Sequence, residues 1–409
     1  MPKSLNILAK GSLIVLGIIM ALTLAEVVAR QLGPPYEPGD EAHRSHQCDP
    51  LLGWRGLPNS ALSVSYHDYQ HEFVLNSRGM HDRERPLEKE TGVFRILVMG
   101  DSMVEALEVN QSETSTQILE DRLNAQASNG LIFEVINAGV FAWGPPQPLV
   151  YFRTEGRLYQ PDLIIAVWFP RNDLLDVLPD HVTTAGPEGG THCFAPYFVM
   201  CDDQFDPRAW YTAPGITSTS QTCSTIKYML TKWLNGIYNN SRLYQRLTAL
   251  LLQVYVKDTF ATHLYAPWLD FERQDSTLNH IYALTTGIYA QLATEARQLD
   301  TETVVVIAPI NEAVDFEVNP ARRAAMVATE PILEGSDPTL PHKVLTESLA
   351  AKGVPVLDLQ PYFVEHVKAG GEPVYWSDTA IHWNVAGNRL AGESMARWLI
   401  EQNLVPSNP

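Results

Sequence analysis

Residues 94–102 read FRILVMGDS, a mostly apolar run that ends in Gly100-Asp101-Ser102. A short apolar run bounded by turn residues indicates a strand buried on both faces, as in a parallel sheet. Ser102 would then follow the carboxyl end of the strand, where open α/β sheets bind their ligands. Taken alone, Gly-Asp-Ser is as typical of a turn or a helix N-cap as of a nucleophile.

The rest of the chain alternates similar apolar runs with helical patterns. Further strands are expected at residues 133–137, 162–169, 303–308 and 354–359. Helices are expected at residues 114–127, 148–159, 278–298, 342–352 and 385–401. Strands that alternate with helices predict a parallel sheet covered on both faces. The expected fold is α/β, a three-layer α/β/α sandwich spanning residues 94–405.

Two long segments do not follow this alternation. Residues 31–93 are expected to form a proline- and glycine-rich linker and then a lead-in of short strands and turns. Residues 177–276 are too long for a simple connection, so we expect an insertion or lid. Its aromatic residues suit stacking on sugar rings or, alternatively, a small core of its own.

The N-terminus has the pattern of a membrane signal. Lys3 and Lys10 precede an uncharged stretch, Gly11 to Ala25. Positive charge before an apolar helix keeps that end in the cytoplasm. We therefore expect residues 1–10 in the cytoplasm, a transmembrane signal-anchor at 11–30, and a single-pass inner-membrane protein whose catalytic domain faces the periplasm or the outside. A cleaved signal peptide is the alternative.

Charge and cysteine content narrow the possible partners. A net charge of -18 argues against nucleic acid as a partner.

The four cysteines, Cys48, Cys193, Cys201 and Cys223, are compatible with two disulfides in an oxidising compartment or with four free thiols. Among the possible pairings we expect Cys193 with Cys201. Their spacing does not fit a zinc site, so no metal or other cofactor is expected.

Three further polar blocks follow predicted strands or precede the last helix. They are Asn137-Ala138-Gly139, Arg171-Asn172-Asp173 and His382-Trp383-Asn384. All three are expected at the rim of the sheet that also carries Ser102.

Together with Gly100-Asp101-Ser102, these blocks resemble the SGNH (GDSL-type) hydrolase family over residues 94–400, with the insertion at 177–276 outside the match. The resemblance implies a flavodoxin-like sandwich in which Ser102 attacks an ester carbonyl and His382 acts as its base. It also implies an oxyanion site made by the backbone N–H groups of Ser102 and Gly139 and the side-chain amide of Asn172. The simpler structural roles are a cap for Asn172, a tight backbone position for Gly139 and a buried core residue for His382.

The acid of the triad departs from the family pattern. Family members place an aspartate two or three residues before the histidine, whereas this chain has Thr379 and Ala380 there and Asp378 one position earlier. A bulged loop would let Asp378 orient His382. Otherwise a backbone carbonyl would orient the imidazole and leave a Ser-His dyad.

The leading functional hypothesis is a serine esterase outside the cytoplasm that removes acetyl or other acyl groups from an envelope or exported polysaccharide. One alternative is O-acyl transfer to a glycan, which needs a multi-span membrane partner to deliver the acyl donor. A lipase or thioesterase is a second alternative. A non-catalytic module that binds an acylated glycan is the third.

Overall fold

The computed structural model describes residues 17, 20–28, 45–66, 69–128, 130–177, 183–185, 192–201, 204–211, 276–329, 334, 337–376 and 381–406. Half of the predicted anchor (11–30) and most of the predicted insertion (177–276) lie outside these ranges. Residues 20–28 are helical. None of the helices within the described ranges combines the length and the apolar character needed to span a bilayer.

Five parallel strands form the central sheet, in the order β13-β12-β7-β5-β6. Their bounds are β5 (Val93–Gly100), β6 (Ile132–Gly139), β7 (Leu163–Trp168), β12 (Glu302–Ile307) and β13 (Val356–Asp358). Every residue of β7 is buried, as are the last six of β5. The predicted parallel sheet is confirmed, with each strand within a few residues of its expected place.

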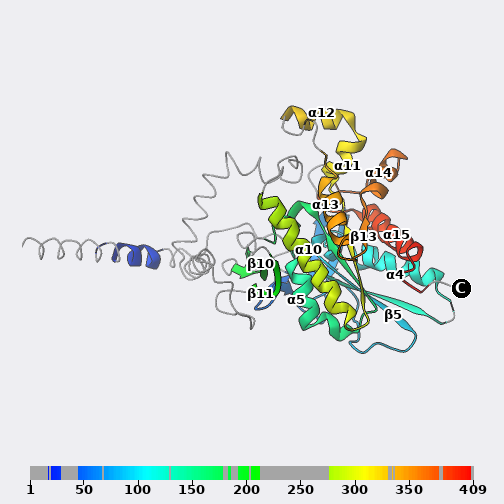
Figure 1. The fold of residues 1–409 in the computed structure, drawn as a ribbon, viewed down its shortest axis with the longest axis horizontal. Coiled ribbons are helices and arrows are strands. Elements are labelled where there is room, and N and C mark those ends of the chain that lie inside the picture. Colours follow the sequence, from blue (N-terminus) through cyan, green and yellow to red (C-terminus); the bar gives the residue numbers. More distant parts are fainter. Residues whose placement is uncertain are drawn as a thin grey trace, which may run out of the picture.

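Helices cover both faces of the sheet (Figure 1). The long ones are α4 (Ser115–Gln126), α5 (Pro146–Thr154), α10 (Ser276–Arg297), α13 (Leu340–Ala350) and α15 (Val385–Glu401). α4 packs on β6 and lies beside α15, whereas α10 packs on β12, α5 and α13. β6 lies on one side of β5, whereas β7, β12 and β13 lie on the other, so the strand order reverses between β5 and β7. Because crossovers between parallel strands are right-handed, this reversal places the helices around α4 and those around α10 on opposite faces.

Shorter helices fill the connections, and among those described only η2 (Gly156–Tyr159) lies within a predicted helix, at residues 148–159. They are α3 (Ser102–Glu105), η1 (Gln111–Glu113), η2 (Gly156–Tyr159), α6 (Pro170–Asp173), α11 (Asn311–Val318), α12 (Pro320–Thr329) and α14 (Gln360–Lys368). Proline occupies one of the first two positions of α6, α12 and α14. Its fixed φ and missing N–H suit a helix start, which is a signal that the prediction did not use.

The described part of the lead-in contains two antiparallel hairpins. β1 (His46–Asp49) pairs with β2 (Gly53–Gly56), and β3 (Ala61–Tyr66) pairs with β4 (Tyr69–Val74). Four more short strands come from the predicted insertion: β8 (Thr183–Ala185), β9 (His192–Phe194), β10 (Tyr197–Cys201) and β11 (Gln204–Tyr211). β8 pairs with β9, and β10 pairs with β11.

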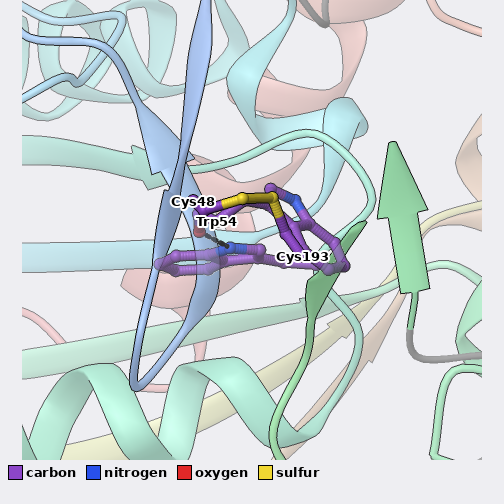
Figure 2. Close-up of a disulfide and its surroundings, with 4 residues drawn as sticks. Cys48, Trp54 and Cys193 are labelled. Carbon is purple, nitrogen blue, oxygen red and sulfur yellow. Dashed lines mark hydrogen bonds between the residues drawn. A yellow bond between two sulfur atoms is a disulfide. The ribbon is translucent and has the colours of Figure 1, made fainter. Parts of the chain in front are cut away.

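A disulfide joins the lead-in to the insertion. It links Cys48 on β1 to Cys193 on β9, with a Cα–Cα distance of 5.3 Å (Figure 2). The predicted pairing of Cys193 with Cys201 is therefore wrong. Closeness in sequence was a poor guide because β9 packs against β1 and β2, which brings together two cysteines that are 145 residues apart. Cys223 lies outside the described residues.

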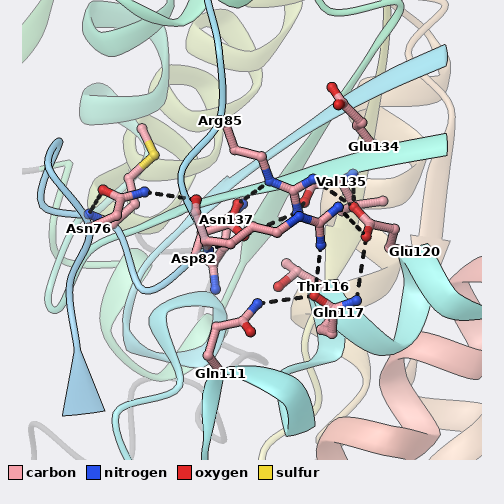
Figure 3. A network of polar contacts seen from close by, with 12 residues as sticks. Asn76, Asp82, Arg85, Gln111, Thr116, Gln117, Glu120, Glu134, Val135 and Asn137 are labelled. Atoms are coloured by element: carbon pink, nitrogen blue, oxygen red, sulfur yellow. Dashed lines mark hydrogen bonds and ion pairs between the residues drawn. The ribbon is translucent and has the colours of Figure 1, made fainter. Parts of the chain in front are cut away.

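Buried charges tie the lead-in to the sheet (Figure 3). Arg85 Nε donates to Asp82 Oδ2 at 3.0 Å, and Arg85 Nη1 lies 2.9 Å from Glu120 Oε2 on α4. Asp82 also contacts the sheet, since its Oδ2 accepts from the backbone N–H of Asn137 at 3.1 Å. The network thus fixes the end of β6, where one of the predicted site blocks lies.

Candidate active site

Ser102 is the first residue of α3 and directly follows the turn at the end of β5. Asp101 caps this helix, because its Oδ1 accepts from the N–H of Met103 at 2.9 Å. Ser102 thus lies beside the reversal of strand order between β5 and β7, the position where doubly wound sheets bind ligands. The structure places the serine where the sequence predicted it.

Two glycines form the surface on which α3 rests. Gly100 and Gly139 are partners in the register of β5 and β6. A Cβ on Gly100 would lie 2.6 Å from Val104 Cγ2, and a Cβ on Gly139 would lie 2.4 Å from the backbone N of Glu105. Side chains at these positions would push α3, and Ser102 with it, away from the sheet.

His382 meets Ser102 across 280 residues of sequence. The Ser102 Oγ to His382 Nε2 distance is 2.8 Å. His382 immediately precedes Trp383, which is buried against Phe363. Asn384 then caps α15 by accepting the N–H of Gly387 at 2.9 Å. The block His382-Trp383-Asn384 therefore anchors the histidine between a core contact and a helix cap.

The other ring nitrogen of His382 faces Glu108. His382 Nδ1 lies 2.6 Å from Glu108 Oε1, and only 6% of the Glu108 side chain is exposed. A carboxylate accepts, so Nδ1 carries the proton and Nε2 is left to accept the Ser102 hydroxyl proton. The sequence predicted Asp378 for this position, and the carboxylate found there is Glu108. Asp378 itself lies in 377–380, outside the described residues.

The environment of His382 sets its protonation. Burial lowers the pKa of His382, but the charge and hydrogen bond of Glu108 and the charge of Asp101 raise it, whereas Arg171 opposes them. The net result is a pKa above the ordinary histidine value. Glu108 thus makes the imidazole a stronger base and stabilises the imidazolium that forms when it takes a proton.

Gly139 already uses the N–H that the oxyanion prediction assigns to it. Its N–H donates to Asn137 Oδ1 at 3.0 Å, and Asn137 Nδ2 donates to the carbonyl of Val104 at 2.8 Å. Gly139 can serve an oxyanion only by sharing or leaving the bond to Asn137. The geometry supports a packing role for this glycine directly.

Asn172 lies on α6, at the end of β7. Its Nδ2 donates to Asp176 Oδ2 at 3.0 Å and makes a longer contact of 3.5 Å with Asp173 Oδ1. The side-chain amide of Asn172 also forms a hydrogen bond that lowers the pKa of Asp101. Asn172 can therefore serve a bound oxyanion only by sharing or leaving one of these carboxyl contacts.

Carboxyl groups surround Asn172. Asp101 and Asp173 are both buried. Burial raises the pKa of Asp101 to about 6, against the opposing effects of the Met103 N–H and the His382 charge. Burial, and then the charges of Asp101 and Asp176, raise the pKa of Asp173 well above its usual range.

Within the described ranges, no group of three or more His, Cys, Asp or Glu side chains is arranged to hold a metal ion.

Comparison with known proteins gives only distant structural likenesses. No family model and no curated protein matches the chain. An acetyl xylan esterase, AlAXEase, is 10% identical with a TM-score of 0.37, over 75% of this chain and 100% of that one. Axe2, an acetylxylan esterase from Geobacillus stearothermophilus, is 12% identical with a TM-score of 0.37, over 74% of this chain and 93% of its own. TesA is 12% identical with a TM-score of 0.35, over 75% and 97%. These likenesses are too weak to assign a function. The fold and the site chemistry are therefore inferred from the strands and side chains of this chain.

Proposed function

We propose that this protein is a serine esterase with Ser102 as nucleophile, His382 as general base and Glu108 as the positioning carboxylate. One observation carries the proposal: a buried carboxylate, an imidazole and a serine hydroxyl form a continuous chain of contacts of 2.6 and 2.8 Å. A serine hydroxyl is a weak nucleophile until a neighbouring base takes its proton, and this arrangement provides that base.

The reaction follows from these contacts. Ser102 Oγ attacks the acyl carbonyl as its proton moves to His382 Nε2, and Glu108 stabilises the imidazolium. His382 then gives the proton to the departing alcohol, which leaves an ester on Ser102. A water molecule, deprotonated by His382, attacks this acyl-enzyme; the bond to Ser102 Oγ breaks, His382 returns the proton to that oxygen, and the acid is released.

The oxyanion would be bound by the backbone N–H of Ser102 and by the side-chain amide of Asn172, which would share or leave one of its contacts with the neighbouring carboxyl groups. Both come from the rim between β5 and β7. Gly139 is a third donor if its bond to Asn137 is shared. Loss of one such donor typically lowers the rate about 100- to 1,000-fold.

Acyl groups on an envelope or exported polysaccharide are the proposed substrate, with the domain anchored by its N-terminal helix outside the cytoplasm. Two features support this location: the Cys48–Cys193 disulfide, which suits an oxidising compartment, and the pattern of Lys3 and Lys10 before an apolar stretch. The altered spacing between Asp378 and His382 leaves a non-catalytic glycan-binding module as an alternative. The contact of Glu108 with His382 favours a catalytic role over that module.

A fluorophosphonate probe tests the nucleophile. Wild-type protein should be labelled at Ser102, whereas S102A and H382A should not, and both variants should lose at least about 10,000-fold in kcat on 4-nitrophenyl acetate. S77A, at an exposed serine, is the matched control and should keep full activity. Labelling at another serine, or unchanged hydrolysis by S102A, would overturn the assignment.

Product analysis tests the substrate class. Incubation with O-acetylated polysaccharide should release free acetate, and release should stop in S102A. Transfer of the acetyl group to an added sugar acceptor would instead indicate an acyltransferase. Hydrolysis confined to long-chain acyl esters or thioesters would contradict the polysaccharide substrate.

A further inference from the structure

The turn that carries Glu108 is held by histidines from the lead-in. This turn, residues 105–108, begins at the last residue of α3 and leads into the connection to η1. Three buried histidines contact it: His46 Nε2 lies 2.8 Å from Glu105 Oε1, His71 Nε2 lies 2.8 Å from the Leu107 carbonyl, and His81 Nδ1 lies 2.7 Å from the Glu105 carbonyl. None of these histidines belongs to the proposed catalytic chain of contacts.

His71 acts on the peptide bond next to Glu108. A carbonyl oxygen only accepts, so His71 carries its proton on Nε2 and donates it to Leu107. The Leu107 carbonyl belongs to the same peptide plane as the N–H of Glu108, so this bond fixes the orientation from which the Glu108 side chain departs. Leu107 also packs against the separate apolar cluster of the β3–β4 region, formed by Val64, Phe73 and Leu75.

His81 holds the other end of the turn. It donates from Nδ1 to the Glu105 carbonyl and lies against Phe73, with ring centroids 4.5 Å apart. Burial lowers the pKa of His81 to about 4, despite the opposing bond to Glu105, so the ring is a neutral donor at neutral pH. Ala106, which follows Glu105, has a φ of 55°, an unfavourable value for a residue with a side chain. Such a conformation persists where surrounding contacts fix it.

Glu105 links the turn to two further segments. One oxygen contacts His46 on β1, and the other accepts from the N–H of Phe141 at 3.0 Å, in the loop after β6. The turn is therefore held by the lead-in on one side and by the loop that follows Gly139 on the other.

We propose that the lead-in is a positioning element for Glu108, in which His71 and His81, together with Leu107 packing, set the carboxylate against His382. This proposal rests on the proposed esterase function and goes beyond it, because it gives residues outside the α/β sandwich a part in aligning the catalytic histidine. A lead-in that only stabilises the fold would lower the free energy of unfolding without changing the basicity of His382.

Substitution of His71 separates these two roles. H71F removes the donor and keeps a ring, whereas H71Q retains an amide N–H near the place of Nε2. We expect H71F to lower kcat about 10- to 100-fold with little change in KM, and H71Q to recover most of the loss. H366A is the matched control, since half-buried His366 also contacts a backbone carbonyl, that of Glu372 at 2.9 Å, but far along the chain from Glu108.

A double-mutant cycle with E108Q assigns the effect to Glu108. If His71 acts through that carboxylate, H71F should add almost nothing to the loss already caused by E108Q. Equal fold-losses from H71F in the wild-type and E108Q backgrounds would overturn the proposal. L107A, which leaves no polar group unpaired, is a second route to the same test in case H71F does not fold.

The pKa of His382 provides a readout that does not need turnover. NMR titration of the His382 ring in the full chain, assigned by comparison with H382Q, should give a lower pKa in H71F and L107A than in wild type or H366A, as it should in E108Q. An unchanged His382 pKa in folded H71F and L107A would overturn the positioning role. Failure of Ser102 to react with fluorophosphonate would instead overturn the esterase function, so the two failures are distinguishable.

Discussion

Ser102 and Glu108 lie on opposite sides of one imidazole, although both belong to the same short stretch after β5. Ser102 Oγ is 2.8 Å from His382 Nε2, and Glu108 Oε1 is 2.6 Å from His382 Nδ1. The nucleophile and the positioning carboxylate thus come from one segment, and only the histidine comes from the far end of the chain. Movement of α3 and its following turn would disturb both partners of His382 together.

Replacement of Glu108 by glutamine should sharply reduce activity. An amide cannot stabilise the imidazolium as a carboxylate does, and it can favour the wrong tautomer, so we expect kcat to fall about 1,000- to 10,000-fold. Hydrolysis of 4-nitrophenyl acetate measures this, with E88Q at an exposed glutamate as the control. A larger loss from D378N than from E108Q would show that Asp378, and not Glu108, orients the histidine.

The pH dependence of the reaction should report the raised pKa of His382. A base must be deprotonated to act, so kcat/KM should rise as the pH increases through the pKa of His382. Burial lowers that pKa, and E108Q removes the main effect that raises it above the usual value. The acid limb of the profile should therefore move to lower pH in E108Q. An acid limb at the same pH in both proteins would contradict this electrostatic account.

The parallel sheet was predictable because its strands are apolar on both faces. Runs such as Leu163–Trp168 carry this signal within a few residues, and Val385–Glu401 carries the period of an amphipathic helix. Ser102 and His382 could be expected to meet because the carboxyl ends of parallel strands share one rim. These conclusions depend on local patterns and on topology, and both are visible in a single sequence.

Glu108 and the Cys48–Cys193 pairing could not be found in the same way. Each depends on how connecting segments return to the core, which no local period encodes. A partial signal for Glu108 was present all the same: Glu105 and Glu108 stand among apolar residues close to the nucleophile, and acids in such a place are candidate buried carboxylates. The disulfide required the docking of β9 on the β1–β2 hairpin.

G139A tests whether the close packing of α3 on the sheet requires a residue without a side chain at position 139. The added methyl group would lie 2.4 Å from the backbone N of Glu105, so α3 must shift. We expect a loss of about 1–3 kcal/mol in the free energy of unfolding, as for other overpacked sites, and a marked fall in kcat. G353A is the control: its φ is +69° and nothing lies within 4 Å of the new Cβ, so it should cost stability through backbone strain and leave kcat unchanged. Full activity in G139A would contradict this role.

Removal of the Cys48–Cys193 disulfide should destabilise the protein. The bond closes a long loop, and loss of a native disulfide typically costs about 2–5 kcal/mol. Urea unfolding of C48S should therefore show a lower midpoint than wild type, and reducing agent should lower the wild-type midpoint towards that of C48S. Peptide mapping under non-reducing conditions checks the pairing directly. A crosslinked peptide joining Cys193 to Cys201 would contradict the structure.

D173N should make stability less sensitive to rising pH. Burial, Asp101 and Asp176 raise the pKa of Asp173 well above its usual range, so the native state holds a proton that the unfolded chain releases above about pH 4. Because the native state then binds more protons than the unfolded state, the free energy of unfolding falls as the pH rises from about 4 towards the native pKa. Asparagine cannot ionise, and its side-chain oxygen can still accept the N–H of Phe169, which lies 2.7 Å from Asp173 Oδ2. Urea unfolding at pH 5 and pH 8 should therefore show a smaller decline in D173N than in wild type, with D121N at an exposed position of α4 as the control. An equal decline in D173N and wild type would show that Asp173 is already ionised in the native state at pH 5.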